Sequence, residues 1–183
     1  TINNNLEIFY YKPAPILISW LGYLSTTGLK EIKHKIGDSY IYPKQFESNF
    51  SEKFIHLSNI WSNFTVTKID NAPKAKFTDI NDNIIFGCFV TLRKINENVI
   101  KLWSKVLKKF PNTKLHFIAP ELHNLSVQNE LKEKFKKNGI MSERLIIEKS
   151  TNYKSYLESY SKVDISLDPF PWNGVTTSFE SIW

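Results

Sequence analysis

The chain has 183 residues, a formal net charge of +6 and one cysteine, Cys88. This length allows one ordinary domain or pieces of two. The lysines are spread along the chain without a dense basic block, so the charge does not favour nucleic-acid binding and we expect no nucleic-acid partner. A single cysteine excludes an internal disulfide and suits a reducing compartment, so we expect a cytoplasmic protein. No apolar run reaches the ~18 residues of a membrane-spanning helix, and no membrane span is expected.

The first part of the chain predicts short strands separated by polar loops. Residues 12–15 form a stiff, proline-containing lead-in, and Ile16–Leu21 is an apolar run that predicts a buried strand. A hydroxyl-rich loop with a glycine at each end, residues 22–28, follows at the carboxyl end of that strand, where open α/β sheets bind ligands. A simple surface turn is the alternative. We expect further short strands at residues 34–38 and, at an edge, at 54–57.

Periodicity weakens from residue 62 to residue 83, where Asn, Asp and Pro accumulate. This change predicts a domain boundary, with residues 1–70 in one domain, a linker at 71–83, and residues 84–183 in a second domain.

The second half alternates regularly between strands and helices. Ser126 is the expected N-cap of one helix, and Gly139 the residue that follows its C-terminus. Such alternation indicates right-handed βαβ units and a parallel sheet, with helices on both of its faces. The expected strands are 84–89, 115–119, 145–148 and 164–168, and the expected helices are 97–110, 126–138, 153–162 and 175–183.

The last twenty residues predict an anion site. A strand ends at Asp168, two prolines and Gly174 form a loop, and Thr176 and Thr177 open an amphipathic helix. Free N–H groups and threonine hydroxyls at such a turn face a phosphate, and Glu180 can accept bonds from a ribose diol. An ordinary N-cap followed by an amphipathic helix explains the same spacing.

Four segments together carry a family resemblance. They are KPAPILISWLGYLSTTG (12 to 28), FSEKFIHL (50 to 57), FGCFVTLRKINENVIKLWSKVLKKFPNTKLHF (86 to 117) and VDISLDPFPWNGVTTSFESIW (163 to 183). In this order they resemble the O-GlcNAc transferase/SPINDLY family of glycosyltransferases. The resemblance implies a GT-B fold of two Rossmann-like domains, with residues 1–70 ending the N-terminal catalytic domain and 84–183 forming most of the nucleotide-sugar-binding domain.

The resemblance also implies the roles of individual residues. Lys94 matches a catalytic lysine near the donor diphosphate, and Tyr156 stands where many members place a histidine against the uracil ring. Glu180 matches an acidic residue on the donor ribose. Further donor contacts are implied at Thr91, Asn173, Gly174, Val175, Thr176 and Thr177, and the loop facing the phosphates or the acceptor contributes Gly22, Tyr23, Thr26 and Thr27.

The implied activity is metal-independent transfer of a sugar, above all GlcNAc from UDP-GlcNAc, to Ser/Thr hydroxyls of a protein or peptide acceptor. The nucleotide sugar is a substrate, and no cofactor or metal is expected, since His and Cys do not occur at metal-ligand spacing. Val90, Thr91, Leu24 and Val175 depart from the family pattern. A GDP-fucose-using protein O-fucosyltransferase and a non-catalytic sugar-nucleotide-binding or interaction protein therefore remain alternatives. The 183 residues alone are expected to be inactive, because the family's base region lies upstream of them.

Overall fold

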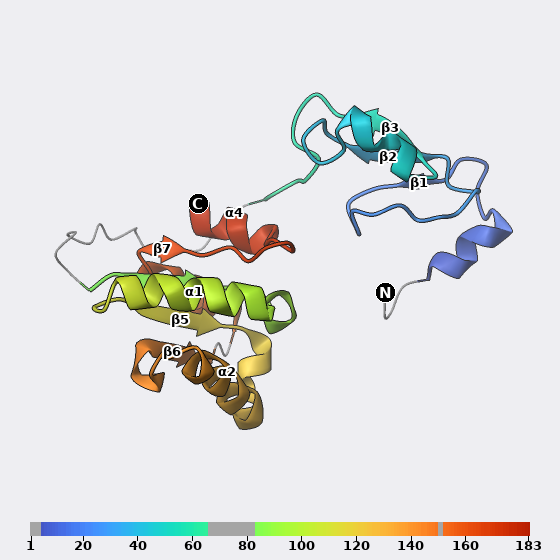
Figure 1. Ribbon diagram of the computed structural model, residues 1–183. Helices are drawn as coiled ribbons and strands as arrows, with labels where there is room; N and C mark the ends of the chain where they lie inside the picture. Colours follow the sequence, from blue (N-terminus) through green and yellow to red (C-terminus); the bar gives the residue numbers. More distant parts are fainter. Residues whose placement is uncertain (1–4, 66–82, 150–151) are drawn as a thin grey trace. The chain divides into compact units, whose positions relative to one another are not determined.

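The computed structural model describes residues 5–65, 83–149 and 152–183, which form two compact units, Thr1–Thr65 and Val66–Trp183. Each unit has its own parallel sheet (Figure 1). The expected linker, 71–83, lies outside the described residues except for Asn83, so the domain assignment stays a prediction.

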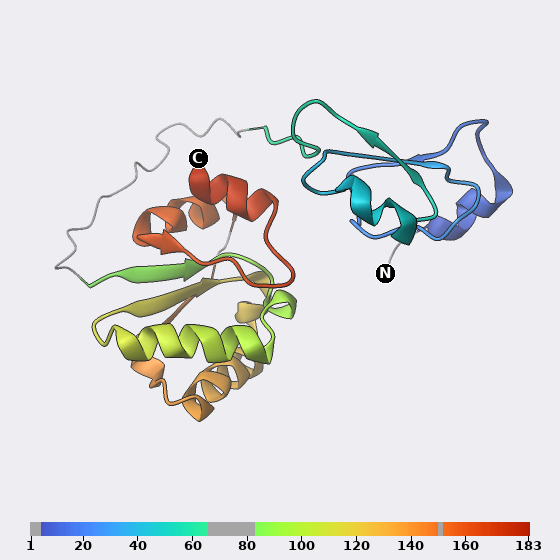
Figure 2. The same cartoon turned by 45° about the horizontal axis from the view of Figure 1, so that its top comes forward.

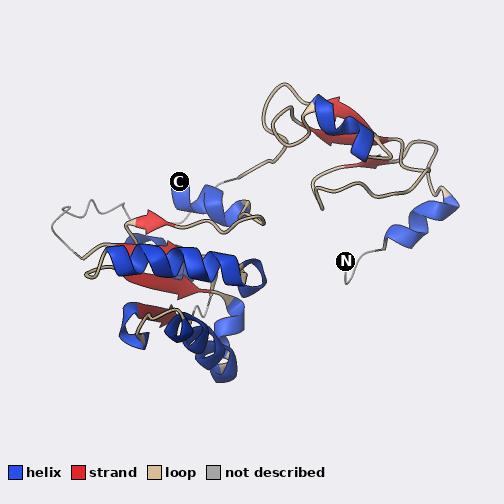
Figure 3. Cartoon of the chain, in the orientation of Figure 1, coloured by secondary structure: helices blue, strands red, loops and turns tan. Residues whose placement is uncertain are grey.

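Unit 1 holds a small three-stranded sheet in the order β1-β2-β3, with all pairs parallel (Figure 3). Its strands lie close to the expected positions, and β3 is an edge strand as predicted. The elements are η1 (Leu6–Tyr11), β1 (Ile18–Ser19), β2 (His34–Gly37), η2 (Lys44–Asn49) and β3 (Lys53–His56).

The prediction of a buried strand over Ile16–Leu21 is wrong. Strand β1 has only two residues, and the apolar side chains of the segment are exposed except for the half-buried Leu17, with Ile16 at 73% and Ile18 at 44%. Pro13 and Pro15 precede the segment and cannot donate ladder hydrogen bonds, while Leu21 has a left-handed φ of 52° that ends the extended backbone. Among the described residues of unit 1, β1 pairs with β2 alone.

Unit 2 holds a four-stranded sheet in the order β6-β5-β4-β7, and every neighbouring pair is parallel, as expected. Buried Val, Ile, Leu, Phe and Trp side chains form one continuous core between the sheet and its helices. The elements are β4 (Ile85–Cys88), η3 (Leu92–Lys94), α1 (Glu97–Lys109), β5 (Lys114–Ile118), η4 (Pro120–His123), α2 (Leu125–Lys137), η5 (Ser142–Arg144), β6 (Leu145–Glu148), α3 (Tyr153–Glu158), η6 (Ser159–Lys162), β7 (Ile165–Ser166) and α4 (Thr176–Ile182).

Adjacent residues of β5 show that helical segments cover both faces of this sheet. Successive strand side chains point to opposite faces. Phe117 packs toward α1, with its ring 6.3 Å from that of Trp103, whereas His116 pairs with Glu148, which accepts a bond from Ser159 of η6. Figure 2 shows α1 and α2 next to each other on one side of the sheet, with α4 away from them.

Several helix ends have capping residues, but two predicted helix boundaries are wrong. The side chain of Asn96 caps α1, and Gly139 follows α2 with a φ of 75°, as expected. The predicted cap at Ser126 is wrong, because Asn124 accepts the N–H of Ser126 and α2 begins one residue earlier. The helix expected over 153–162 ends at Glu158 and continues as the 3-10 turn η6.

The strand order creates a reversal in the sheet. From β4 the chain moves to β5 and then β6, but from β6 it returns to the other side of β4 to form β7. Ligands of open α/β sheets bind at the carboxyl ends of the strands beside such a reversal. A ligand site is therefore expected at the segments that follow β4, β5 and β7. In the described part of the chain, no helix has the length and apolar character needed to cross a membrane.

Candidate functional site

A cavity of about 480 Å³ opens in unit 2 beyond the carboxyl ends of β4 and β5. It combines aromatic and apolar walls with a lysine and several hydroxyl groups. Such a mixture suits a ligand that has both a flat ring and a charged part. Its lining residues are Phe89, Val90, Thr91, Lys94, Ile118, Ala119, Pro120, His123, Asn152, Tyr153, Tyr156 and Thr177.

Lys94 lies at the end of η3, directly after β4, and supplies the positive charge of the cavity wall. Its Nζ atom donates a hydrogen bond to the carbonyl oxygen of Asn173 at 2.6 Å. Partial burial lowers the pKa of Lys94 from its ordinary value, while the nearby carboxylate of Asp168 acts in the opposite direction. The lysine thus joins two segments of the predicted site and is partly shielded from water.

The turn before α4 is held by Asp168, which the sequence analysis did not assign to the site. The Gly174 N–H donates to Asp168 Oδ1 at 2.7 Å, and Ser178 Oγ donates to Oδ2 at 3.2 Å. The N–H of Gly174 is thus already engaged by Asp168, and the binding of a phosphate at this turn stays a prediction. A Cβ at Gly174 would lie 2.6 Å from Thr177 Oγ1, so close packing of the turn requires glycine.

Helix α4 is short, and it presents Thr177 rather than Thr176 to the cavity. Val175 is its N-cap residue and provides no side-chain hydrogen bond. Thr177 lines the large cavity and also a smaller one of about 200 Å³, which contains Asp168 and Ser178. Val175 and Thr176 begin the helix but do not line the large cavity.

Aromatic side chains form part of the lining of the same cavity as Lys94. Tyr156 stacks on Tyr153, with centroids 6.2 Å apart and planes at 20°, and meets the ring of Phe89 edge-on at 6.1 Å. Burial raises the pKa of Tyr156, so its hydroxyl stays protonated throughout the neutral range. The wall provides flat apolar surface where a base ring can stack.

Glu180 stands on α4 with both carboxylate oxygens engaged. Tyr153 donates its hydroxyl to Oε1 at 2.6 Å, and Tyr160 lies 3.2 Å from Oε2. The carboxylate is thus fixed against α3 and η6, and Glu180 does not itself line the cavity. A ribose hydroxyl that binds Glu180 must share these oxygens with the two tyrosines.

The predicted loop of unit 1 is organised around the buried carboxylate of Glu52. Thr26 donates its hydroxyl to Oε2 at 2.6 Å, and the Thr27 N–H donates to Oε1 at 2.7 Å, with the Thr27 hydroxyl on the same oxygen. Buried Lys35 donates to the carbonyl oxygen of Tyr23 at 3.1 Å. A Cβ at Gly22 would meet nothing within 4 Å. The two threonines have internal partners, and a contact of this loop with phosphate or acceptor stays a prediction.

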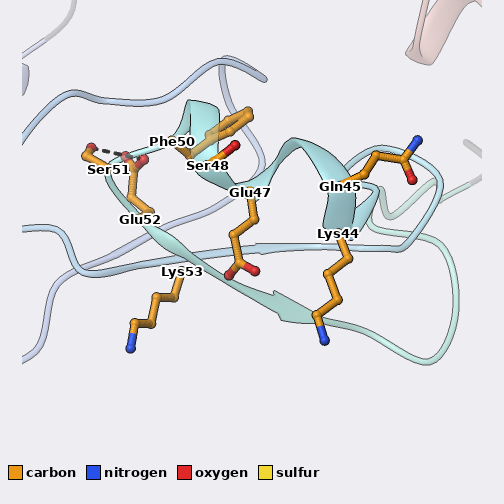
Figure 4. Close-up of a pocket in the computed structure, with 8 residues that line it drawn as sticks. All are labelled: Lys44, Gln45, Glu47, Ser48, Phe50, Ser51, Glu52 and Lys53. Atoms are coloured by element: carbon orange, nitrogen blue, oxygen red, sulfur yellow. Dashed lines mark hydrogen bonds between the residues drawn. The ribbon is translucent and has the colours of Figure 1, made fainter.

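A wider hollow of about 710 Å³ in unit 1 does not have the character of a site (Figure 4). All its lining residues come from one short stretch of chain, η2 and the start of β3. Their side chains point in several directions without converging, and Glu52 is already bound to the threonines of the loop. The lining residues are Lys44, Gln45, Glu47, Ser48, Phe50, Ser51, Glu52 and Lys53.

The cavity lining contains some of the predicted donor-site residues but not Asn173, Gly174, Val175, Thr176 or Glu180, and the binding of a donor stays a prediction. Thr91, Lys94, Tyr156 and Thr177 come together in the lining, as the prediction requires. The sequence analysis missed Phe89, His123, Asn152, Tyr153 and, behind the wall, Tyr160. A signal was present for the tyrosines, because positions 153, 156 and 160 follow the three- and four-residue spacing of one helix face.

Comparison with known proteins agrees with this architecture. The profile of glycosyl transferase family 41 matches residues 1–66 and 62–183. The chain therefore belongs to glycosyl transferase family 41, and the resemblance to the O-GlcNAc transferase/SPINDLY family is confirmed. A solved structure, "Thermobaculum terrenum O-GlcNAc transferase mutant - K341M", superposes with a TM-score of 0.84 at 28% identity, over 96% of this chain and 33% of that one. The parallel α/β architecture is thus of the GT-B type.

Plant relatives match the whole chain or nearly all of it. A protein of Solanum lycopersicum, "Probable UDP-N-acetylglucosamine--peptide N-acetylglucosaminyltransferase SPINDLY", is 29% identical over all of this chain and 20% of its own length. A protein of Arabidopsis thaliana, the probable transferase of the same activity named SEC, is 27% identical over 97% of this chain and 19% of its own length. The chain thus spans about a fifth of the length of these relatives.

Proposed function

We propose that this chain is the donor-binding part of a protein glycosyltransferase that moves GlcNAc from UDP-GlcNAc to Ser/Thr hydroxyls of a protein or peptide acceptor. The observation that carries the proposal is the cavity where Lys94 and Thr177 lie together with the ring of Tyr156. The names of the relatives support the choice of UDP-GlcNAc as donor and of a peptide as acceptor.

The chemistry requires stabilisation of a leaving nucleoside diphosphate. When an acceptor hydroxyl attacks the anomeric carbon, the bond to the diphosphate breaks and negative charge grows on the departing phosphate oxygens. A positive charge and hydroxyl donors already in place stabilise that charge without reorganisation. Lys94 is the group proposed for the charge, and the Thr177 hydroxyl for the hydrogen bond. Asn173 and Gly174 shape the turn between them through their backbone contacts.

The remaining donor groups follow from the cavity wall. Tyr156 is the proposed stacking surface for the base, with Phe89 holding its edge. Glu180, which accepts a hydrogen bond from the lining residue Tyr153, is the proposed acceptor for a ribose hydroxyl. Thr91 lines the cavity together with Lys94. Each of these groups acts on the nucleotide, which leaves recognition of the protein acceptor to other parts of the enzyme.

The proposed transfer is metal-independent, with Lys94 in the place that a divalent cation takes in metal-dependent enzymes. Among residues 5–65, 83–149 and 152–183, no group of three or more His, Cys, Asp or Glu side chains is arranged to hold a metal ion. Activity in excess EDTA, compared with activity in excess magnesium, tests this proposal, and loss of transfer in EDTA would contradict it.

Binding of UDP and GDP to the full-length protein, followed by isothermal titration calorimetry, tests the donor assignment. The proposal predicts tighter binding of UDP than of GDP and transfer of GlcNAc to a peptide mixture. Tighter binding of GDP with transfer of fucose would identify the alternative O-fucosyltransferase. Binding of UDP without hydrolysis or transfer would identify a non-catalytic binding protein.

A further inference from the structure

The hydroxyl of Tyr160 contacts three residues of the predicted donor site, although Tyr160 does not line the cavity. Tyr160 belongs to η6, and its oxygen is 2.9 Å from the Tyr156 hydroxyl, 3.0 Å from the Thr177 carbonyl oxygen and 3.2 Å from Glu180 Oε2. Its ring stacks on Phe89, with centroids 3.9 Å apart and planes at 25°. One side chain therefore contacts four residues of the site, two of them on α4.

The hydrogen-bonding capacity of a phenol defines how these contacts work. A tyrosine hydroxyl has one proton to donate and accepts through its oxygen. The Tyr160 hydroxyl lies within donating distance of two acceptors on α4, the Thr177 carbonyl and the Glu180 carboxylate, and its oxygen is in reach of the Tyr156 hydroxyl. Burial raises the pKa of Tyr160, so the proton stays in place at any pH at which the protein is used.

We infer that Tyr160 is a positioning residue for nucleotide binding, whose hydroxyl sets the places of Thr177, Glu180 and Tyr156 relative to one another. The inference rests on the proposed function, because it assumes that those three groups bind the nucleotide. Helix α4 has only the seven residues Thr176–Ile182, and its N-cap provides no side-chain bond. An isolated helix of this length is not stable, so its position depends on tertiary contacts such as these.

The ring and the hydroxyl of Tyr160 have separable roles. The ring packs on Phe89 and contributes to the stability of unit 2, whereas the hydroxyl bonds to Thr177 and Glu180 of α4. Tyr160→Phe keeps the stack and removes the hydroxyl. If Tyr160 had a purely structural role, Tyr160→Phe would lower the unfolding temperature or the fraction of protein that binds UDP. The Kd for UDP of the protein that still binds would then be unchanged.

The test is calorimetric titration of the full-length protein with UDP, for wild type, Tyr160→Phe and the control Tyr40→Phe, whose ring is 91% exposed in unit 1. We expect Tyr160→Phe to raise the Kd about three- to tenfold, the effect of one ordinary hydrogen bond, with unchanged stoichiometry. Tyr40→Phe is expected to keep the wild-type Kd. In a Glu180→Gln background, Tyr160→Phe should have a smaller effect, because residues that act through each other are not additive.

The outcomes separate this inference from the proposal on which it rests. If wild type does not bind UDP, the proposed function fails and the inference fails with it. If wild type binds UDP and Tyr160→Phe binds it equally well, only the inference is overturned. Equal effects of Tyr160→Phe in the wild-type and Glu180→Gln backgrounds would overturn the action through Glu180.

Discussion

The ammonium group of Lys94 reaches the carbonyl oxygen of Asn173 across 79 positions of sequence, at 2.6 Å. This hydrogen bond ties the segment after β4 to the turn before α4. These are the two segments on either side of the reversal in the sheet of unit 2. It places a positive charge beside the cavity that Thr177 also lines.

Replacement of Lys94 by Ala is expected to lower kcat about a hundredfold or more, with a smaller change in the donor KM. Charge on the leaving phosphate is greatest in the transition state, so the lysine contributes most there. Steady-state kinetics of the full-length protein checks this. Arg93→Ala is the matched control, because it removes an exposed positive charge next to Lys94. A rise in KM at constant kcat for Lys94→Ala would show that the lysine serves ground-state binding alone.

The two threonines of α4 should differ in their effects. Thr177→Val removes the hydroxyl at nearly constant shape and is expected to weaken UDP binding roughly tenfold, the effect of one charge-assisted bond. Thr176→Val is expected to have a smaller effect, because Thr176 does not line the cavity. Calorimetric Kd values for the two variants decide the point. The reverse order would mean that the diphosphate lies at the start of the helix rather than in the cavity.

Asn96 has two roles that substitution can separate. Its side chain accepts the N–H groups of Asn98 and Val99 as the cap of α1, and its Nδ2 atom donates to the carbonyl oxygen of Phe170 at 3.1 Å. Asn96→Ala should lower the free energy of unfolding by about 1 kcal/mol, because the cap is lost. Asn96→Asp keeps a capping acceptor and should largely retain stability. Chemical denaturation of both variants measures this, and equal losses would refute the capping role.

The buried His116 should make stability depend on pH. It is 2% exposed and lies 3.0 Å from Glu148, and burial lowers its pKa below the ordinary value of 6.5, although Glu148 acts in the opposite direction and Lys162 in the same one. The unfolded chain therefore takes up this proton more readily than the folded protein. The free energy of unfolding should therefore fall as the pH drops below about 6.5. The pKa of Glu148 is also lowered in the folded protein, and its contribution to stability should be lost only below about pH 4.5.

His116→Gln provides the comparison for that pH dependence. Unfolding temperatures measured between about pH 7.5 and 5.5 should decline less steeply in this variant than in wild type. Parallel declines would show that other groups carry the proton linkage.

The elements of the second half of the chain could be predicted from the sequence, because apolar side chains recur there with helical spacing between short apolar strands. The stripe of Val99, Ile100 and Trp103 predicts α1 and its buried face, and all three side chains are buried. The run Ile16–Leu21 misled the prediction, because apolar composition alone does not tell a buried strand from an exposed one. Burial of a strand also depends on its neighbours in the sheet, and within residues 5–65 strand β1 pairs with β2 alone.

Part of the lining of the candidate site could be predicted from the family pattern. Lys94 and Tyr156 were found by position in the family pattern, and both line the cavity. The contacts of Asp168 and Tyr160 were not predicted, because they depend on how the turn before α4 folds. Asp168 accepts the N–H of Gly174, six residues further on, and Tyr160 donates to the carbonyl oxygen of Thr177; the spacing of the tyrosines indicates a shared helix face but not this partner.

The most direct test of the donor site is a crystal structure of the full-length protein with bound UDP. We predict the diphosphate within hydrogen-bond distance of Lys94 Nζ and Thr177 Oγ1, and the uracil ring against Tyr156. UDP bound away from this cavity, or bound in it with the diphosphate turned away from Lys94, would contradict the proposed function.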